Sequence, residues 1–413
     1  STIFFNPAGL TQLQHMEVDM GLHLIAPRSE FNNDGSSFPL GALDGSDGGN
    51  AGSLAPVPNF YVALPINDRM VAGLGVNAPF GLVTEYDDDW VGRYHAVKSD
   101  MLTININPAL AFKATEKLSI GIGINLQYID LELTQALDLG TGCALTAQTL
   151  SNIPGALTPQ QAGLLGAASS CAQPQLHDGK AKLTADDWSW GYNLGLIFEA
   201  TDTTRVAFSY RSKISHNLTG EGAFSIPTNN APTLAGLAAA GFADGPISGG
   251  VALPESASFA VHHQVNNKWA VMADVSWTRW SRFQALTIES PDATSKLNSS
   301  KEEKWDNNMR YGLGLTYEHN DKWIFRGGVA YDETPISDQF RTPRIPGEDR
   351  KWIAVGASYK YSDHITIDAG YTHVFVSDPS IDDATTDVLA HELIGEYDAS
   401  VDILGVQMRW LFL

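Results

Sequence analysis

Residues 102–112, LTININPALAF, and residues 118–128, LSIGIGINLQY, are the two stretches that decide the fold class. In both, an apolar residue alternates with a small or polar one, which is the period of a β-strand with one apolar face. Each stretch exceeds an ordinary strand of roughly 5–6 residues and reaches the roughly 9–11 residues of a tilted transmembrane strand. A soluble β-sandwich would show the same alternation, so the connections between strands must separate the two classes.

The predicted connections alternate along the chain between tight turns and long loops. Outer-membrane barrels combine short periplasmic turns with long outer loops and carry aromatic girdles at both interfaces. Aromatic residues lie close to the predicted turns, and counting the connections gives about 14 strands, an even number as in single-chain bacterial barrels. We therefore predict an all-β fold, a 14-stranded antiparallel transmembrane β-barrel. Tight turns are predicted at Asn67-Asp68, Thr115-Glu116, 201–203, Asn266-Asn267, Asn320-Asp321 and Ser362-Asp363.

The composition fits this class and excludes others. The chain has 413 residues, a formal net charge of −21, 43% hydrophobic residues and 10% aromatic residues. The negative charge argues against a nucleic-acid partner. No apolar run approaches the roughly 18 residues of a membrane helix. A soluble all-β protein remains the alternative on composition alone. Because the chain starts at Ser1 without a signal-peptide pattern, we expect the mature product of an exported precursor.

Residues 73–86, GLGVNAPFGLVTEY, contain the most unusual predicted strand. Alternation holds up to Asn77 and is then interrupted by Pro79, Phe80 and Gly81. Proline has no N–H for pairing, and glycine inside a strand often marks a bulge or bend. In a soluble sheet this is a minor defect, but in a closed membrane barrel it would be an opening in the wall.

Two long loops, near 134–186 and 220–250, are predicted on the outer side. The first has a helix start at Thr158-Pro159 followed by apolar residues, and the second has apolar residues among alanines. Exposed apolar faces suit the capture of a hydrophobic solute; the alternative is that the loops only pack on each other as a lid. The predicted capture residues are Leu164, Leu165, Leu234, Leu237 and Phe242.

Cys143 and Cys171 are the only cysteines and fall in the first of these loops. In an oxidising periplasm they would pair and close the loop, and two free thiols are the alternative.

Several short motifs, taken in order, resemble the FadL family of outer-membrane long-chain fatty-acid transporters over nearly all of the chain. The resemblance implies a 14-stranded barrel plugged by an N-terminal hatch. Residues 1–12 would be the remnant of that hatch and residues 13–413 the barrel. The motifs are Asn6-Pro7-Ala8, the hatch signature, with FGLVTEY at 80–86, WGYN at 190–193, AFSYRS at 207–212, WTRWS at 277–281 and FRGGVAYD at 325–332.

The resemblance also implies a route for the solute. In the family, a solute is caught between two outer loops, passes to an inner pocket and leaves sideways through a gap at a kink in the third strand. The kink glycine corresponds to Gly81. A fatty acid needs an apolar pocket and a cation for its carboxylate. Lys301 aligns with the head-group lysine of the family, with Lys304 as the near alternative. The position of a family arginine corresponds to Gln135, which leaves room for neutral solutes.

No pattern for catalysis or metal binding is present. His262 and His263 are adjacent on a predicted strand and point to opposite faces, and neither a nucleophile elbow nor an HExxH pattern occurs. We predict no enzymatic activity, cofactor or metal. The predicted function is passive uptake of long-chain fatty acids or similar hydrophobic molecules across the bacterial outer membrane. The chain would act as a monomer among outer-membrane lipid and lipopolysaccharide. The alternatives are an aromatic-hydrocarbon channel of the same fold, a general aqueous porin and a structural or adhesin-like barrel.

Overall fold

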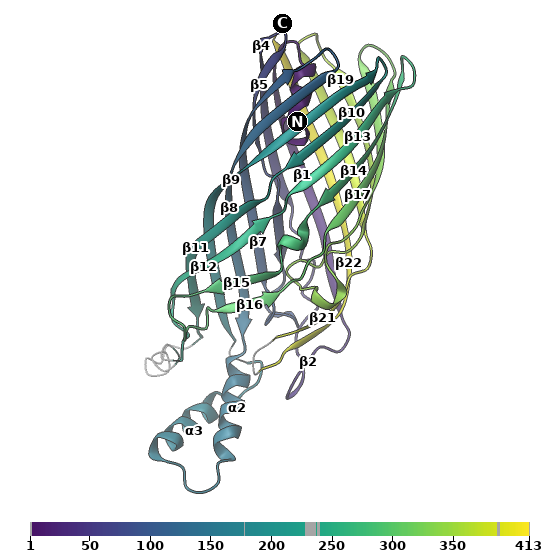
Figure 1. Ribbon diagram of the computed structural model, residues 1–413. Helices are drawn as coiled ribbons and strands as arrows, with labels where there is room; N and C mark the ends of the chain where they lie inside the picture. The colour runs from purple at the N-terminus through teal and green to yellow at the C-terminus, as the bar shows by residue number, and fades with distance from the viewer. Residues whose placement is uncertain (1, 177, 228–236, 238–239, 386–388, 413) are drawn as a thin grey trace.

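The computed structural model describes residues 2–176, 178–227, 237, 240–385 and 389–412, and its strands form a closed antiparallel barrel (Figure 1). Among the 22 strand segments, β2 and β3 form a small hairpin at the loop end, and six barrel strands are divided in two, so the wall has 14 strands. Pairing of β1 with β22 closes the barrel. The fold-class prediction is confirmed.

The strand bounds follow the chain from one end of the wall to the other. They are β1 (Met16–Asn33), β2 (Ser37–Phe38), β3 (Gly41–Ala42), β4 (Ala55–Asn67), β5 (Met70–Asn77), β6 (Gly81–Glu85), β7 (Lys98–Lys113), β8 (Leu118–Leu137), β9 (Gly179–Thr201), β10 (Thr204–Arg211), β11 (Ile214–Ser225), β12 (Gly245–Leu253), β13 (Ser256–Gln264), β14 (Trp269–Thr278), β15 (Ala285–Glu289), β16 (Ser299–Glu302), β17 (Asn308–Glu318), β18 (Trp323–Asp332), β19 (Arg350–Lys360), β20 (Ile365–Val376), β21 (Ser380–Ala384) and β22 (Glu392–Phe412).

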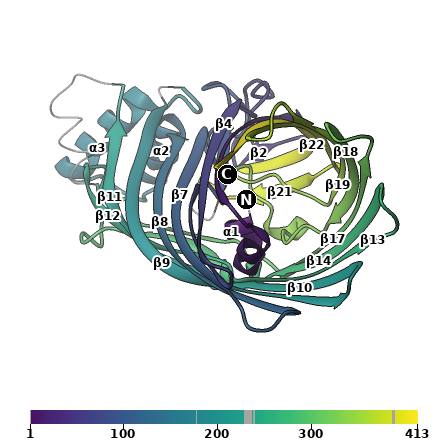
Figure 2. The ribbon, with the colours of Figure 1, turned by 90° about the horizontal axis from the view of Figure 1, so that it is seen from above.

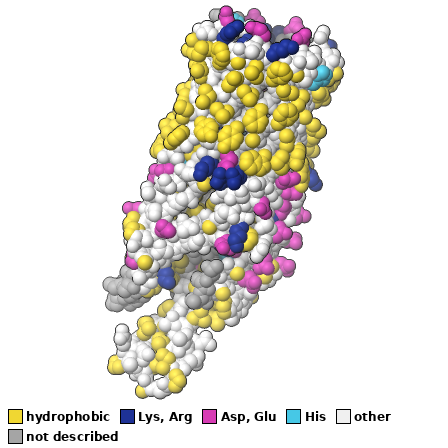
Figure 3. Space-filling model, in the orientation of Figure 1, with side chains coloured by type: hydrophobic (Ala, Val, Ile, Leu, Met, Phe, Trp, Pro, Cys, Tyr) yellow, Lys and Arg dark blue, Asp and Glu magenta, His cyan; other side chains and the backbone are white. Residues whose placement is uncertain are grey.

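The outer surface carries a band of hydrophobic side chains around the half of the barrel that ends in tight turns (Figure 3). Ile120, Ile122 and Ile124 of β8 point outward into this band and are 43%, 51% and 56% exposed. Aromatic pairs such as Trp323 with Tyr359, whose ring centroids are 4.7 Å apart, lie near the turns, as expected for a membrane-interface girdle. Charged side chains gather beyond the band, toward the long loops. No helix among the described residues has the length and apolar character of a membrane span.

The N-terminal segment lies inside the barrel (Figure 2). It forms α1 (Thr2–Phe5) and the short helix η1 (Pro7–Gln12). The Asn6 side chain accepts a hydrogen bond from the Ala8 N–H at 3.1 Å and donates to the carbonyls of Leu196 and Phe208 on the wall, at 3.2 and 3.1 Å. Glycine permits this approach, because a Cβ at Gly195 would lie 2.1 Å from Asn6 Oδ1.

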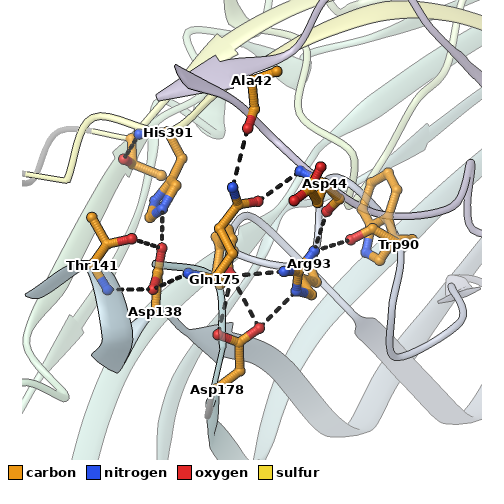
Figure 4. Close-up of polar contacts among 11 residues, drawn as sticks. Ala42, Asp44, Trp90, Arg93, Asp138, Thr141, Gln175, Asp178 and His391 are labelled. Carbon is orange, nitrogen blue, oxygen red and sulfur yellow. Dashed lines mark hydrogen bonds and ion pairs between the residues drawn. The ribbon is translucent and has the colours of Figure 1, made fainter. Parts of the chain in front are cut away.

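A pair of helices projects from the loop end of the barrel, α2 (Leu139–Ser151) and α3 (Pro159–Cys171) (Figure 1). A disulfide joins Cys143 to Cys171. Polar contacts hold the base of the pair to the barrel loops (Figure 4). Asp138 caps α2 through the Thr141 N–H at 2.8 Å and lies 3.2 Å from His391 Nε2, and Arg93 Nε donates to Asp178 at 2.7 Å. The two ends of the helical insertion are therefore fixed, while its body stands outside the barrel.

The third barrel strand and the interior

The lumen-facing side of β8 changes its chemical character along the strand. Toward the tight turns it presents small and polar side chains, and toward the loops it presents apolar ones. We call these two stretches of the lumen the polar half and the apolar half. On β8 the polar half comprises Ser119, Gly121, Gly123, Asn125 and Gln127, and the apolar half comprises Ile129, Leu131 and Leu133.

The third barrel strand is broken between β5 and β6. β5 pairs with both β4 and β7, whereas β6 pairs in register with β7 alone. Asn77 stands opposite Asn105 and Gly81 opposite Leu102, so residues 78–80 oppose only residues 103–104. One residue is therefore in excess. The Thr103 hydroxyl accepts a hydrogen bond from the Phe80 N–H at 3.0 Å and donates to the Phe80 carbonyl at 2.6 Å. Since Thr103 faces the lumen, these bonds draw the kink inward.

The break leaves a gap in the pairing between β4 and β6. The last β4–β5 pair is Phe60 with Val76, and the next contact is the isolated bridge from Gly52 to Thr84. We call the unpaired stretch between these two contacts the wall gap.

Two prolines, Pro56 and Pro58, lie on the β4 side of the wall gap. The Ser29 carbonyl of β1 accepts a hydrogen bond from the Ala51 N–H, so the backbone carbonyl of Ser29 points toward the β4 side. Backbone groups of alternate residues of β1 point the same way, so those of His23 also point toward β4, where His23 pairs with Val57. The backbone groups of Pro56 and Pro58 therefore face the gap. Because proline has no N–H, this edge offers no donor at either position.

Candidate functional site

An apolar hollow lies against the apolar half of the lumen, where five strand segments meet. Its side chains come from β8, β9, β11, β12 and β15, and we call them the apolar wall. Apolar surface of this kind stabilises a hydrocarbon chain by roughly 25 cal/mol per Å² removed from water, although the hollow as it stands has room for only about one water molecule. The apolar wall comprises Leu131, Leu133, Leu183, Leu218, Ile247, Leu286 and Ile288.

Lys301 stands at one end of the apolar wall. It lies opposite Leu286 in the β15–β16 pairing, and residues directly opposite each other share a face of the sheet. Its ammonium forms an ion pair with Asp383 of β21. Lys304 follows the strand and makes separate contacts, with Glu302 at 2.7 Å and over the ring of Phe340 at 4.6 Å. The structure thus brings Lys301, of the two predicted lysines, beside the apolar wall.

Arg344, in the loop between β18 and β19, is a second cation at this end of the lumen and was missed by sequence reasoning. Its guanidinium donates to Gln135 Oε1 at 3.1 Å, and Gln135 is the next lumen-facing residue of β8 after Leu133. Burial lowers the pKa of Arg344 to about 10, so it remains charged at neutral pH. The only signal in the sequence was a basic residue in a long loop, which is too common to single out.

Glu303 lies between the cations and a row of aromatic rings. Burial raises the pKa of Glu303 to about 7, although the Trp305 indole N–H, 3.3 Å away, acts in the opposite direction. The Trp305 ring lies 4.9 Å from that of Trp280, which lies 6.0 Å from that of Phe80 in the kink. These rings, which we call the aromatic row, extend from the cation end of the apolar wall to the wall gap.

The polar half contains a network of asparagines beside the kink. Asn105 donates to Asn125 at 3.0 Å, and the Arg211 guanidinium donates to the same Asn125 oxygen at 2.7 Å. Arg211 also donates to the Phe4 carbonyl at 2.6 Å, which joins the network to the N-terminal segment. Asn77, the last residue of β5, faces Asn105 across the β5–β7 pairing. The wall gap therefore opens next to the polar half.

Residues 1–412 match the family model described as outer membrane protein transport protein (OMPP1/FadL/TodX). The chain belongs to this family. A putative outer membrane protein of Neisseria meningitidis is 30% identical over 100% of this chain and 89% of its own length. A long-chain fatty acid transport protein of Shigella flexneri is 30% identical over 89% of this chain and 80% of its own. The crystal structure of a Pseudomonas aeruginosa FadL homologue superposes with a TM-score of 0.86 at 26% identity, covering 100% of this chain and 94% of that one.

Membership in the FadL family confirms the resemblance and fixes the broad function. The chain is a bacterial outer-membrane β-barrel that acts as a channel for hydrophobic compounds, and not an enzyme. The family match does not assign individual residues, so the roles predicted for Lys301, Lys304 and Gly81 stay predictions.

The described capture residues of this FadL-family chain lie on two separate loop segments. Leu164 and Leu165 are on α3, which packs on α2 outside the barrel (Figure 1). Leu237 is half-buried, and the ring of Phe242 lies 5.4 Å from that of Phe224 on β11. Leu234 lies outside the described residues. The Phe242 N–H donates to the Leu237 carbonyl at 3.0 Å, so these two residues form one group, while Leu164 and Leu165 lie on the projecting helix pair.

Proposed function

We propose that this channel takes up long-chain fatty acids and releases them sideways through the wall gap. One observation carries the proposal: an apolar wall ends at a lysine, and an aromatic row leads from there to an interruption in the barrel wall. The apolar wall would hold the hydrocarbon tail, and the cations at its end would hold the carboxylate. A relative named as a long-chain fatty acid transport protein, 30% identical to this chain, supports the same substrate class.

Uptake of neutral aromatic hydrocarbons is a second candidate. It is favoured by Gln135, which stands where the family resemblance placed an arginine, and by an apolar wall that would accept any small apolar solute. The two candidates differ in a measurable way, since only a fatty acid has a charge that the cations can bind. The two candidates are separated by measuring uptake of labelled oleate in the presence of an excess of either unlabelled oleate or toluene, and comparing how strongly each competes.

The register at the kink gives a sharp test of sideways release. Because residues 78–80 oppose residues 103–104, deletion of Pro79 alone restores a continuous register of the third strand with β7. Deleting 79–81 would keep the same β6 residues facing the lumen but would shift β6 by two residues along β7. On the β4 side of the wall gap, Pro56 and Pro58 have no N–H to donate. The variant designed to close the gap, which we call the closing variant, therefore combines deletion of Pro79 with Pro56→Val and Pro58→Val.

We expect uptake of labelled oleate by cells carrying this closing variant to fall to that of cells lacking the protein. Pro79→Ala is the matched control, because it keeps the excess residue and therefore the gap. Heat-shifted migration in semi-native electrophoresis checks that both barrels are folded. Undiminished oleate uptake through the folded closing variant would overturn sideways release.

A further inference from the structure

Two arginines in the loop between β18 and β19 lie three positions apart but have opposite surroundings. The Arg341 guanidinium pairs with two carboxylates, those of Asp338 and Glu348, and its side chain is fully buried. Arg344 donates four hydrogen bonds to neutral acceptors only. Among the described residues, no carboxylate lies within ion-pair distance of Arg344. Arg341 thus has the bonding of a structural arginine, and Arg344 does not. The neutral acceptors of Arg344 are the Lys98 and His95 carbonyls, Ser99 Oγ and Gln135 Oε1, at 3.1–3.3 Å.

Arg344 is held in place by the barrel rather than by its own loop. The loop backbone is anchored to β6, because the Thr84 hydroxyl donates to the Arg344 carbonyl at 3.1 Å. The side chain is anchored to β7 and β8 through Ser99 and Gln135. These contacts place the guanidinium between the apolar wall, which ends at Leu133, and the third barrel strand. A cation fixed at this point is pre-organised, so little conformational entropy is lost when it binds a ligand.

The guanidinium retains capacity for an anion. Four of its five N–H groups are used, and Nε–H has no acceptor among the described residues. The residue as a whole is partly buried, and its guanidinium lies among groups of β7 and β8 on the inner side of the barrel. An unpaired charge in such a place is costly, and a carboxylate that docks there recovers the cost. Guanidinium also matches the planar geometry of a carboxylate better than ammonium does.

Lys301 is less available than Arg344 for the same role. Its ammonium is already paired with Asp383, and Asp383 is also 3.1 Å from His95 Nδ1. A ligand carboxylate at Lys301 would have to compete with a directly paired Asp383, whereas the direct partners of Arg344 are neutral and the Glu303 and Asp383 carboxyls act on it only from beyond ion-pair distance.

We propose that Arg344 binds the carboxylate of the transported amphiphile and makes the channel select ionised long-chain acids over neutral apolar solutes. This inference rests on the proposed uptake function and assigns its specificity to one residue. Gln135 then orients the guanidinium, and the apolar wall receives the tail.

The test measures binding to the purified full chain in detergent, with a fluorescent polyene fatty acid and its methyl ester as the two probes. The variants are Arg344→Met, Arg344→Lys and the matched control Lys180→Met, which removes a half-exposed cation of the loop end that pairs with Asp88. We expect Arg344→Met to weaken binding of the acid by about tenfold or more and to leave the ester unchanged, as for loss of one charged hydrogen-bonded contact. Arg344→Lys should restore part of the affinity, and Lys180→Met should change neither probe.

Each other outcome has a definite meaning. Equal loss of acid and ester in Arg344→Met would show a role in loop folding only and overturn the inference. So would unchanged binding of the acid. In both cases wild-type binding of the acid would leave the proposed function intact. Failure of the wild-type chain to bind either probe would overturn the uptake function as well.

Discussion

The two halves of the lumen differ in what they can hold. In the apolar half, Leu131, Leu133 and Leu218 line a small, largely apolar hollow. In the polar half, Asn105 donates to Asn125, which also accepts from Arg211, and Arg211 donates to the Phe4 carbonyl of the N-terminal segment. Under the proposed function, this difference would place retention and release apart: the tail would be held where the lumen is apolar, and the wall gap lies where the lumen is polar.

Energetics favour this separation. Burying apolar surface stabilises a bound tail by roughly 25 cal/mol per Å². Pushing the same tail among the asparagines would deprive amides of partners, at about 1–3 kcal/mol for each group left unsatisfied. On the proposed route, a hydrocarbon chain that leaves the apolar wall would gain more by passing through the wall gap into lipid than by continuing along the lumen.

The largest expected effect comes from placing a charge in the apolar half. Leu131→Asp puts a carboxylate against the tail, and we expect affinity for the fluorescent fatty acid to fall by about a hundredfold, since the cost is near 3 kcal/mol. Gln127→Glu puts the same charge in the polar half, where His216 Nε2 lies 3.1 Å from the Gln127 oxygen, and should change affinity little. Similar losses in both variants would erase the distinction between the halves.

A moderate effect is expected from Glu303 at the end of the apolar half. With its pKa near 7, Glu303 is mostly neutral below that pH and charged above it. A fatty acid stays ionised above roughly pH 5, so its affinity should fall by up to about tenfold as the pH rises through 7, because a second negative charge develops beside it. The methyl ester should show no such dependence.

Glu303→Gln removes the titratable carboxyl of Glu303 and leaves in place the charged groups that face it. These are Lys301, Asp383 and Arg344, with His95 behind Asp383. We expect this variant to bind the fatty acid with nearly constant affinity between about pH 6 and about pH 8. A pH dependence that persists in Glu303→Gln would assign the effect to another member of the cluster.

The smallest effect on uptake is expected from the disulfide. Replacing Cys143 and Cys171 by serine removes a cross-link between positions 28 apart, which should destabilise the α2–α3 pair locally by about 3 kcal/mol. Limited proteolysis should then cut the pair faster, while oleate uptake stays within about twofold because the pair stands outside the barrel. A large loss of uptake would instead support the predicted capture role of Leu164 and Leu165.

The barrel and its interruption could be predicted from the sequence because both depend on local alternation. The period of two in β7 and β8 requires a sheet with an apolar outer face, and Pro79 and Gly81 mark the break without reference to any other strand. The choice between Lys301 and Lys304 needed the register of β16 with β15, which the sequence does not supply.

Arg344 could not be predicted, for a different physical reason. Its contact with Gln135 joins residues 209 positions apart, and it depends on a loop path that crosses the lumen. No periodic pattern encodes such a path. The substitution at Gln135 suggested a weaker preference for carboxylates, and only the three-dimensional structure places a guanidinium against that side chain.

The prolines at the wall gap have a consequence for life in a crowded membrane. An unpaired strand edge normally recruits another strand, whether from a neighbouring barrel or from a chain that is still folding. Pro56 and Pro58 remove the donors that such recruitment requires, at the same positions where β4 lacks a partner. The wall gap can therefore persist without a covering strand, which the proposed sideways exit requires.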